Sequence, residues 1–187
     1  MKSVVNEILD ELEVLSNEID QKQIDEVIHL MCDAHKNGNK VFLAGAGRSG
    51  CIVRAFTNRV MHLGFNCYVV GDITTPPIKK NDILFLISGS GKTTSLVKQA
   101  EKSVSLGAKI ITITLNSEGD IAKMASAKII LPGNTRLSNN AGFVSRQPIG
   151  SAFEQLAWLT CDGLIMLMRD ALGQTNDDLI AHHANLE

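Results

Sequence analysis

The spacing of apolar residues along the chain changes near residue 40. Over residues 3–20 and 22–36 apolar side chains recur every three or four positions, which is typical of amphipathic helices. After Gly38, a helix stop signal, short apolar runs alternate with helical segments. This alternation predicts a parallel β-sheet covered by helices on both faces. The predicted strands are residues 41–44, 67–70, 83–87, 109–115 and 128–131.

The segments between the strands carry further helix and loop signals. Gly64 and Gly107 follow helical patterns over residues 51–63 and 94–106, and glycine tolerates the left-handed conformation that ends many helices. Residues 132–148 are rich in Pro, Gly, Asn and Ser. Such a composition predicts a long loop, and long loops in compact domains often carry function.

A last helix, predicted over about residues 151–172, is apolar on nearly every side. Its apolar residues are Phe153, Leu156, Ala157, Trp158, Leu159, Leu164, Ile165, Leu167 and Met168. A surface helix of a monomer does not show this pattern, so the helix is either central to the core or packed against a copy of itself. Because two more amphipathic helices precede the sheet, we expect a homo-oligomer with a helical interface.

Length and composition restrict the class of protein. A chain of 187 residues that is 44% hydrophobic predicts one domain over residues 1–187, in which residues 1–37 form a helical extension. The net charge of −2 and the lack of a basic run argue against nucleic acid or an anionic membrane as a partner. The sequence shows no signal peptide and no apolar run of the roughly 18 residues that a membrane span needs. We therefore expect a soluble cytoplasmic protein.

The cysteines and histidines do not suggest a metal centre. Cys32, Cys51, Cys67 and Cys161 lie in apolar surroundings and form no C-x-x-C pair, which predicts buried thiols in a reducing compartment. The five histidines show no metal-ligand spacing. We predict no metal site and no cofactor.

Two glycine-rich loops, residues 45–50 and 88–93, each follow an apolar strand and open a helix. A helix start leaves backbone N–H groups unpaired, glycines let an anion approach them, and hydroxyls add donors. The pair of loops therefore predicts a site for a phosphorylated small molecule. In a flavodoxin-like sheet of order 2-1-3-4-5 the two loops would lie side by side, whereas the dinucleotide-binding order 3-2-1-4-5-6 would separate them. The sequence thus favours a doubly wound α/β fold with five parallel strands in the first order.

Two alternatives concern the first loop and the end of the second. Gly45, Gly47 and Gly50 satisfy G-x-G-x-x-G, and Asp72 follows about where a ribose-binding acid would lie, so a nucleotide-binding Rossmann unit stays open. It leaves the second loop unexplained and the chain without room for a substrate domain. The second loop ends like a P-loop, but Leu86 occupies the position of that motif's first glycine, which excludes it.

A third alternative is that the second loop only caps a helix. One serine would satisfy that role. Ser88, Ser90 and Thr93 together exceed what one helix start requires.

The loops, together with motifs at residues 61–64, 74–76, 148–154 and 183–186, resemble the sugar isomerase (SIS) domain, and more closely the 6-phospho-3-hexuloisomerases. The resemblance covers nearly the whole chain except residues 132–147. It implies a flavodoxin-like fold, commonly a homotetramer, without a cofactor. The implied reaction interconverts D-arabino-hex-3-ulose 6-phosphate and D-fructose 6-phosphate in the ribulose monophosphate route of formaldehyde fixation. A non-catalytic sugar-phosphate-binding module of the same family stays an alternative.

The resemblance also implies which residues hold the substrate. The implied phosphate-binding residues are Gly47, Ser49, Ser88, Gly89, Ser90, Gly91 and Thr93. Glu154 resembles the glutamate base of these isomerases, which would carry a proton between C2 and C3 of the sugar through an enediolate. From spacing alone, Glu154 could instead close a capping box with Ser151.

Three basic residues complete the candidate site. Arg48 is expected either to stabilise the developing enediolate or to form an ordinary surface ion pair. His62 is a proton shuttle or substrate contact, in its own or a neighbouring subunit's pocket, or else a cation at a helix C-terminus. His183 is a candidate for the same site roles as His62. The tail after Gly173, in which it lies, is expected to close over the site.

Overall fold

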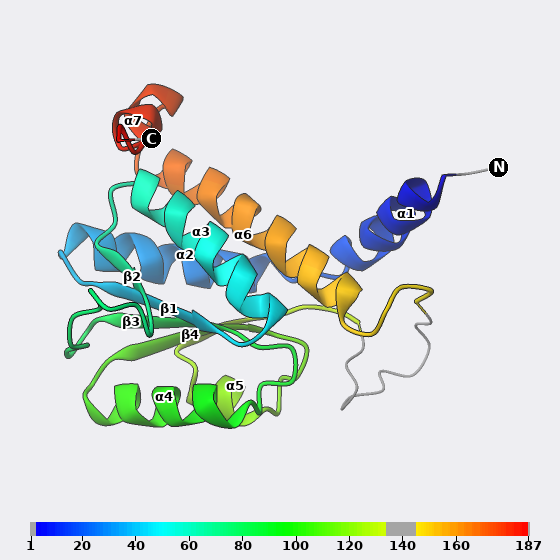
Figure 1. Cartoon of the computed structure of the whole chain (residues 1–187), viewed down its shortest axis with the longest axis horizontal. Coiled ribbons are helices and arrows are strands. Elements are labelled where there is room, and N and C mark those ends of the chain that lie inside the picture. Colours follow the sequence, from blue (N-terminus) through cyan, green and yellow to red (C-terminus); the bar gives the residue numbers. More distant parts are fainter. Residues whose placement is uncertain (1–2, 134–144, 187) are drawn as a thin grey trace.

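The computed structural model describes residues 3–133 and 145–186 (Figure 1). In chain order the elements are α1 (Val4–Ser16), α2 (Gln21–Lys36), β1 (Val41–Gly45), α3 (Arg48–His62), β2 (Cys67–Val69), β3 (Ile83–Ile87), α4 (Thr94–Ser105), β4 (Lys109–Thr114), α5 (Asp120–Met124), β5 (Ala127–Ile130), α6 (Ser151–Ala171) and α7 (Asn176–Ala181). The predicted strands and long helices are confirmed to within a few residues.

The five strands form one parallel sheet of order β2-β1-β3-β4-β5. The predicted flavodoxin-like order is therefore confirmed, and the order of a dinucleotide-binding unit is excluded. Asp72, the candidate ribose ligand, forms an ion pair of 2.8 Å with Arg54 instead. In the pairing of β1 with β3, Gly45 lies opposite Ile87, so the two glycine-rich loops leave the sheet from adjacent strand ends.

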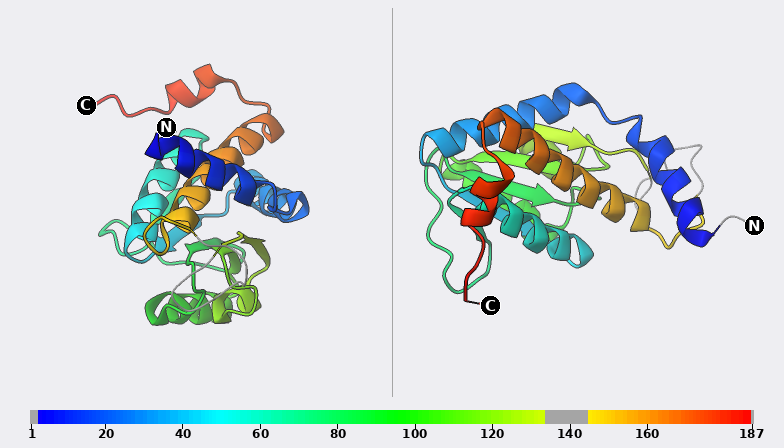
Figure 2. Two further views of the ribbon diagram at one scale, coloured as in Figure 1. Left: turned by 90° about the vertical axis from the view of Figure 1, so that its right-hand side faces the viewer. Right: turned by 90° about the horizontal axis from the view of Figure 1, so that it is seen from above.

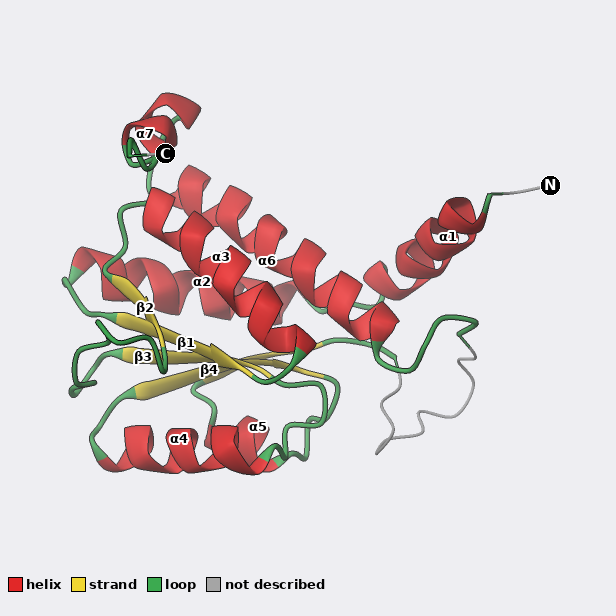
Figure 3. Ribbon diagram, viewed as in Figure 1, coloured by secondary structure: helices red, strands yellow, loops and turns green. Residues whose placement is uncertain are grey.

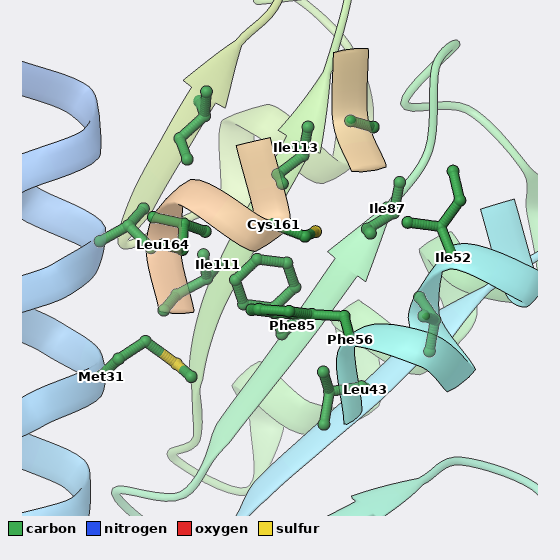
Figure 4. Packing of buried hydrophobic residues seen from close by; sticks show 14 of the residues in the cluster. Met31, Leu43, Ile52, Phe56, Phe85, Ile87, Ile111, Ile113, Cys161 and Leu164 are labelled. Carbon is green, nitrogen blue, oxygen red and sulfur yellow. The ribbon is translucent and has the colours of Figure 1, made fainter. Parts of the chain in front are cut away.

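Helices cover both faces of the sheet, and each layer has its own apolar core (Figure 3). The larger core lies between the sheet and α2, α3 and α6, where the rings of Phe56 and Phe85 are 5.2 Å apart and Met31, Leu43 and Cys161 pack around them (Figure 4). The smaller core lies beneath α4 and α5, where Leu84 and Leu86 of β3 meet Leu96 of α4. The central strand β3 is buried throughout, as its uninterrupted apolar sequence requires.

The chain buries only one side of the long helix α6. One side is buried against the sheet layer, as predicted for a core helix. The other side leaves Trp158, Leu159, Met166 and Leu167 exposed, and α1 exposes Val4, Val5, Leu9 and Val14. Figures 1 and 2 show α1 at one end of α6 and α7 at the other. The prediction of a core helix is confirmed for one side of α6, and packing against a second copy stays a prediction for the exposed side.

Three features differ from the sequence-based expectations or lie outside them. The short helices α5 and α7 were not predicted. The prediction of buried thiols is confirmed for Cys32 and Cys161 but is wrong for Cys51, which is exposed, and for Cys67, which is half-buried at the edge strand β2. Most of the predicted loop 132–148 falls outside the described residues. Among the residues that the structure describes, no helix is both long and apolar enough to cross a membrane.

Candidate active site

The first glycine-rich loop joins β1 to α3 at very short range. A Cβ atom on Gly45 would lie 2.8 Å from the Ser49 carbonyl oxygen, and one on Gly50 would lie 2.9 Å from the Gly45 carbonyl oxygen. Only glycine at both positions lets the helix start this close to the strand end. Gly47 is the N-cap of α3 and offers no side chain to the first N–H groups, while Ser49 lies in the first turn. The Gly50 N–H donates to the Gly47 carbonyl at 3.0 Å, which leaves the N–H groups of Arg48 and Ser49 at the helix start for an anion.

The second loop presents hydroxyl groups that do not cap α4. Thr93 is the N-cap of this helix, yet its side chain makes no capping hydrogen bond. Its Oγ1 lies 3.5 Å from the Oγ of Ser88, which is buried, and the Ser90 Oγ accepts from the Lys92 N–H at 3.2 Å. The interpretation of this loop as a simple helix cap is therefore wrong. Gly89 and Gly91 complete a cradle next to the first loop.

Arg48 and Glu154 form an ion pair, although 106 positions separate them in the sequence. Arg48 opens α3 and Glu154 lies in the first turn of α6, and these helices run side by side from the same end of the sheet (Figure 1). The Glu154 side chain is 18% exposed and that of Arg48 is 75% exposed. The hydrogen bond and the charge of Glu154 raise the pKa of Arg48, so the guanidinium stays charged.

The capping-box interpretation of Glu154 is wrong. Gly150, with φ of 93°, is the N-cap of α6, so Ser151 is already the first helical residue and caps nothing. The left-handed Gly150 starts the helix one residue earlier than a capping box with Ser151 would. The carboxylate of Glu154 is therefore directed to Arg48 rather than to the backbone of its own helix.

An apolar hollow of about 500 Å³ lies beside this ion pair. Arg48, Cys51, Glu154 and Trp158 line it together with residues of α1, among them Leu9. Sequence reasoning did not place α1 at the site. Apolar residues cover more of the surface of α1 than one buried face requires, and this pattern was the available signal.

His62 and His183 lie elsewhere in the same chain. His62 is the last residue of α3, and a rise of about 1.5 Å per residue puts it about 21 Å from Arg48 along the helix. Its ring is 3% exposed and stacks on that of His183 at 4.6 Å, while His182 Nδ1 lies 3.1 Å from the His62 carbonyl oxygen. The structure therefore does not bring either histidine to Glu154 within one chain, and the tail does not cover the chain's own ion pair.

A second hollow, of about 410 Å³, surrounds this histidine pair between α3 and α6. Arg59, Asp162 and Cys161 line it, and complete burial raises the pKa of the Cys161 thiol, which stays protonated. Trp158 lines both hollows, so they lie one after the other along the groove between the two helices.

Comparison with known proteins agrees with this fold and with these loops. Residues 35–159 match the SIS domain family. The 3-hexulose-6-phosphate isomerase of Bacillus subtilis is 38% identical over 98% of this chain and 97% of its own, and that of Mycobacterium gastri is 38% identical over 79% of this chain and 74% of its own. A crystal structure from Methanococcus jannaschii, for which a function of 3-hexulose-6-phosphate isomerase was inferred, has a TM-score of 0.82 at 32% identity and covers 98% of both chains. The chain belongs to the SIS domain family.

Proposed function

We propose that this protein is a 3-hexulose-6-phosphate isomerase, which interconverts D-arabino-hex-3-ulose 6-phosphate and D-fructose 6-phosphate. The observation that carries the proposal is the Arg48–Glu154 pair beside two loops suited to a phosphate. Relatives of that name match nearly the whole chain. An isomerase of this kind leaves the overall oxidation state of its substrate unchanged and needs no oxidant or reductant.

In the proposed mechanism the phosphate lies among the hydroxyls of Ser49, Ser88, Ser90 and Thr93 and the backbone of the second loop. The helix N-termini and the Thr93 hydroxyl, which does not cap α4, support this placement. The phosphate thus fixes one end of the open-chain sugar, and the carbonyl carbons extend toward the ion pair. Positioning of this kind converts part of the binding energy into rate.

Glu154 acts as the base. In the direction from fructose 6-phosphate to the 3-ketose it removes a proton from C3, and the electrons of the C–H bond form the C2–C3 double bond of an enediolate as the C2 carbonyl becomes an oxyanion. The hydroxyl proton of the C3 oxygen passes to the C2 oxygen, Glu154 returns its proton to C2, and C3 becomes the ketone. In the opposite direction C2 loses the proton. Arg48 stabilises the negative oxygen of the enediolate, because a fixed charge lowers the barrier to charge build-up.

A role for His62 or His183 at this site requires a second copy of the chain, because about 21 Å of α3 separates them from Arg48. We propose a homo-oligomer, a tetramer by resemblance, in which the exposed apolar residues of α1 and α6 are covered. The groove between α3 and α6 carries Glu154 at one end and His62 at the other. Two copies related by a two-fold axis across its middle would bring unlike ends together.

We also propose that residues 1–187 form one domain and that the protein is cytoplasmic. Leu12 and Leu15 of α1 and Met31 of α2 belong to the same apolar cluster as the sheet, which supports the first statement. Residues 1–37 then act as a helical extension of the matched SIS region.

The proposal is tested with purified protein and D-fructose 6-phosphate. Nuclear magnetic resonance should detect the 3-ketose, and thermal unfolding should shift with fructose 6-phosphate but not with NAD. Stabilisation by the sugar phosphate without turnover would identify a non-catalytic binding module. Stabilisation by NAD alone would reject a phosphosugar site.

A further inference from the structure

The second loop is held by the segment that follows β4. Gly89 O accepts from Leu115 N at 3.1 Å and from Thr114 Oγ1 at 3.2 Å, and Ser90 O accepts from Asn116 Nδ2 at 3.1 Å. The next carbonyl, that of Gly91, accepts from the backbone N–H at the start of α5 at 3.1 Å. Three consecutive carbonyls of the loop are thus tied to one neighbouring segment.

These bonds decide which way the loop's N–H groups point. A trans peptide group directs its C=O and its N–H to opposite sides. Because Gly89 O is held by Thr114 and Leu115, the N–H of Ser90 points away from that segment. Within residues 3–133 and 145–186 neither the Gly89 N–H nor the Ser90 N–H has an acceptor. Both amides stay free for an anion.

The holding segment is itself tightly fixed. Thr114 is fully buried, and its Oγ1 accepts from the Asn116 N–H at 3.2 Å. Asn116 Oδ1 accepts from the Glu118 N–H at 3.1 Å. A Cβ on Gly119 would lie 3.1 Å from the Gly91 Cα, so the loop and the segment touch backbone to backbone. The segment can transmit a fixed geometry to the loop.

We propose that Thr114 and Asn116 are positioning residues for the phosphate. Neither needs to touch the substrate. Thr114 holds the Gly89 carbonyl on one side so that the free Ser90 N–H faces the other. Asn116 holds the Ser90 carbonyl, and the N–H of the same peptide group, that of Gly91, closes the turn of the loop on the Ser88 carbonyl at 3.1 Å. This proposal rests on the proposed placement of the phosphate in this loop. It adds two residues, on the strand and turn after the loop, to those that determine phosphate affinity.

The test compares Thr114→Val with Thr112→Val. Thr112 is two residues earlier on β4, is also fully buried and also donates through Oγ1 to a carbonyl of the neighbouring chain segment, that of Leu86 at 3.1 Å. Leu86 lies within β3 and not in the loop. The two substitutions therefore remove the same group from the same strand. Thr114→Val removes a donor to a loop carbonyl together with the acceptor of the Asn116 N–H, both within the contact between loop and holding segment, whereas Thr112→Val removes a donor to a carbonyl within β3.

The dissociation constant of inorganic phosphate is measured by calorimetry, and KM and kcat are measured with fructose 6-phosphate. For Thr114→Val we expect phosphate affinity to fall and KM to rise by about tenfold, the effect of misaligning one charged hydrogen bond, with kcat within about twofold. Thr114→Ser should restore both values. Thr112→Val should leave them unchanged even where it lowers the melting temperature.

Equal losses in Thr114→Val and Thr112→Val, or unchanged phosphate affinity in Thr114→Val, would overturn the proposal. If Thr114→Val does not fold, Asn116→Ala decides, because Asn116 is only partly buried and its loss frees the Ser90 carbonyl. Unchanged phosphate affinity in Asn116→Ala then refutes it. Phosphate binding that responds as expected in a protein without isomerase activity would reject the proposed function and leave this inference intact.

Discussion

Replacing Glu154 by glutamine removes the proposed proton acceptor and little else. Glutamine keeps the length of the side chain and an oxygen that can accept from Arg48. Because Gly150 rather than Ser151 caps α6, the start of the helix does not depend on the carboxylate. The folded state should also tolerate the change, since Arg48 is 75% exposed and solvent screens the ion pair.

The expected magnitude follows from the role of the base. General acid–base catalysis contributes about 10²–10⁴-fold, which corresponds to roughly 2.7–5.4 kcal/mol of transition-state stabilisation. We expect kcat to fall by this factor. KM should change much less, because the groups proposed to bind the phosphate lie in the second loop rather than at Glu154.

The assay is steady-state isomerisation with the melting temperature measured alongside. Glu101→Gln is a matched control, because Glu101 is also paired, with Lys98 at 2.7 Å on the surface of α4, but lies outside the site. The control should retain full activity. A Glu154→Gln enzyme with nearly normal kcat would show that Glu154 is not the base.

Three further predictions concern the fold, its pH dependence and its assembly. Gly50→Ala should destabilise the protein, because the new Cβ would lie 2.9 Å from a backbone oxygen. The loss should exceed about 1 kcal/mol, which is roughly what a Gly-to-Ala change gains where the backbone accepts it. Gly163→Ala, which meets nothing within 4 Å inside α6, should instead stabilise it by roughly 0.5–1 kcal/mol, and urea unfolding compares the two. Burial, and to a smaller extent the nearby His182, lower the pKa of His35 below its usual 6.5. The neutral His35 ring therefore contributes to stability above pH 6.5, and this contribution is lost as the pH falls through the folded-state pKa. When the pH is lowered from about 8 to 5, the melting temperature of His35→Phe should therefore fall less than that of the parent protein. An equal fall in both would show that protonation of His35 does not cause the loss of stability. Leu159→Glu should dissociate the oligomer in sedimentation experiments, whereas a monomeric parent protein would contradict the proposed interface.

The strand order and the adjacent loops could be predicted because they follow from local patterns. Apolar runs fix the strands, and the position of the second loop after the third strand selects between two known sheet orders. The short helix α5 could not be predicted, because five residues give too little periodicity. The capping box of α7, formed by Thr175 and Asp178, was a readable signal for its start.

At the candidate site, the spacing of residues in the sequence leaves some roles undecided, and the contacts in the folded chain decide them. Ser151 and Glu154 have the spacing of a capping box, yet the left-handed Gly150 takes the N-cap. His62 and Arg48 are both site candidates on one helix, and spacing left open whether they share a site within one chain; the length of α3 places them at its two ends. The hydrogen bonds from Thr114 and Asn116 to the second loop join residues that are 25 and 26 positions apart in the sequence. A pattern of neighbouring residues cannot predict such bonds.

Hydrogen exchange on D-fructose 6-phosphate in heavy water tests most directly whether one carboxylate carries a proton between C2 and C3. The account predicts that the native protein incorporates deuterium at C2 of the 3-ketose, and at C3 of fructose 6-phosphate after the return from the 3-ketose, and that Glu154→Gln incorporates almost none at either carbon. Isomerisation without any solvent deuterium at either carbon in the native protein, together with full activity of the variant, would contradict it.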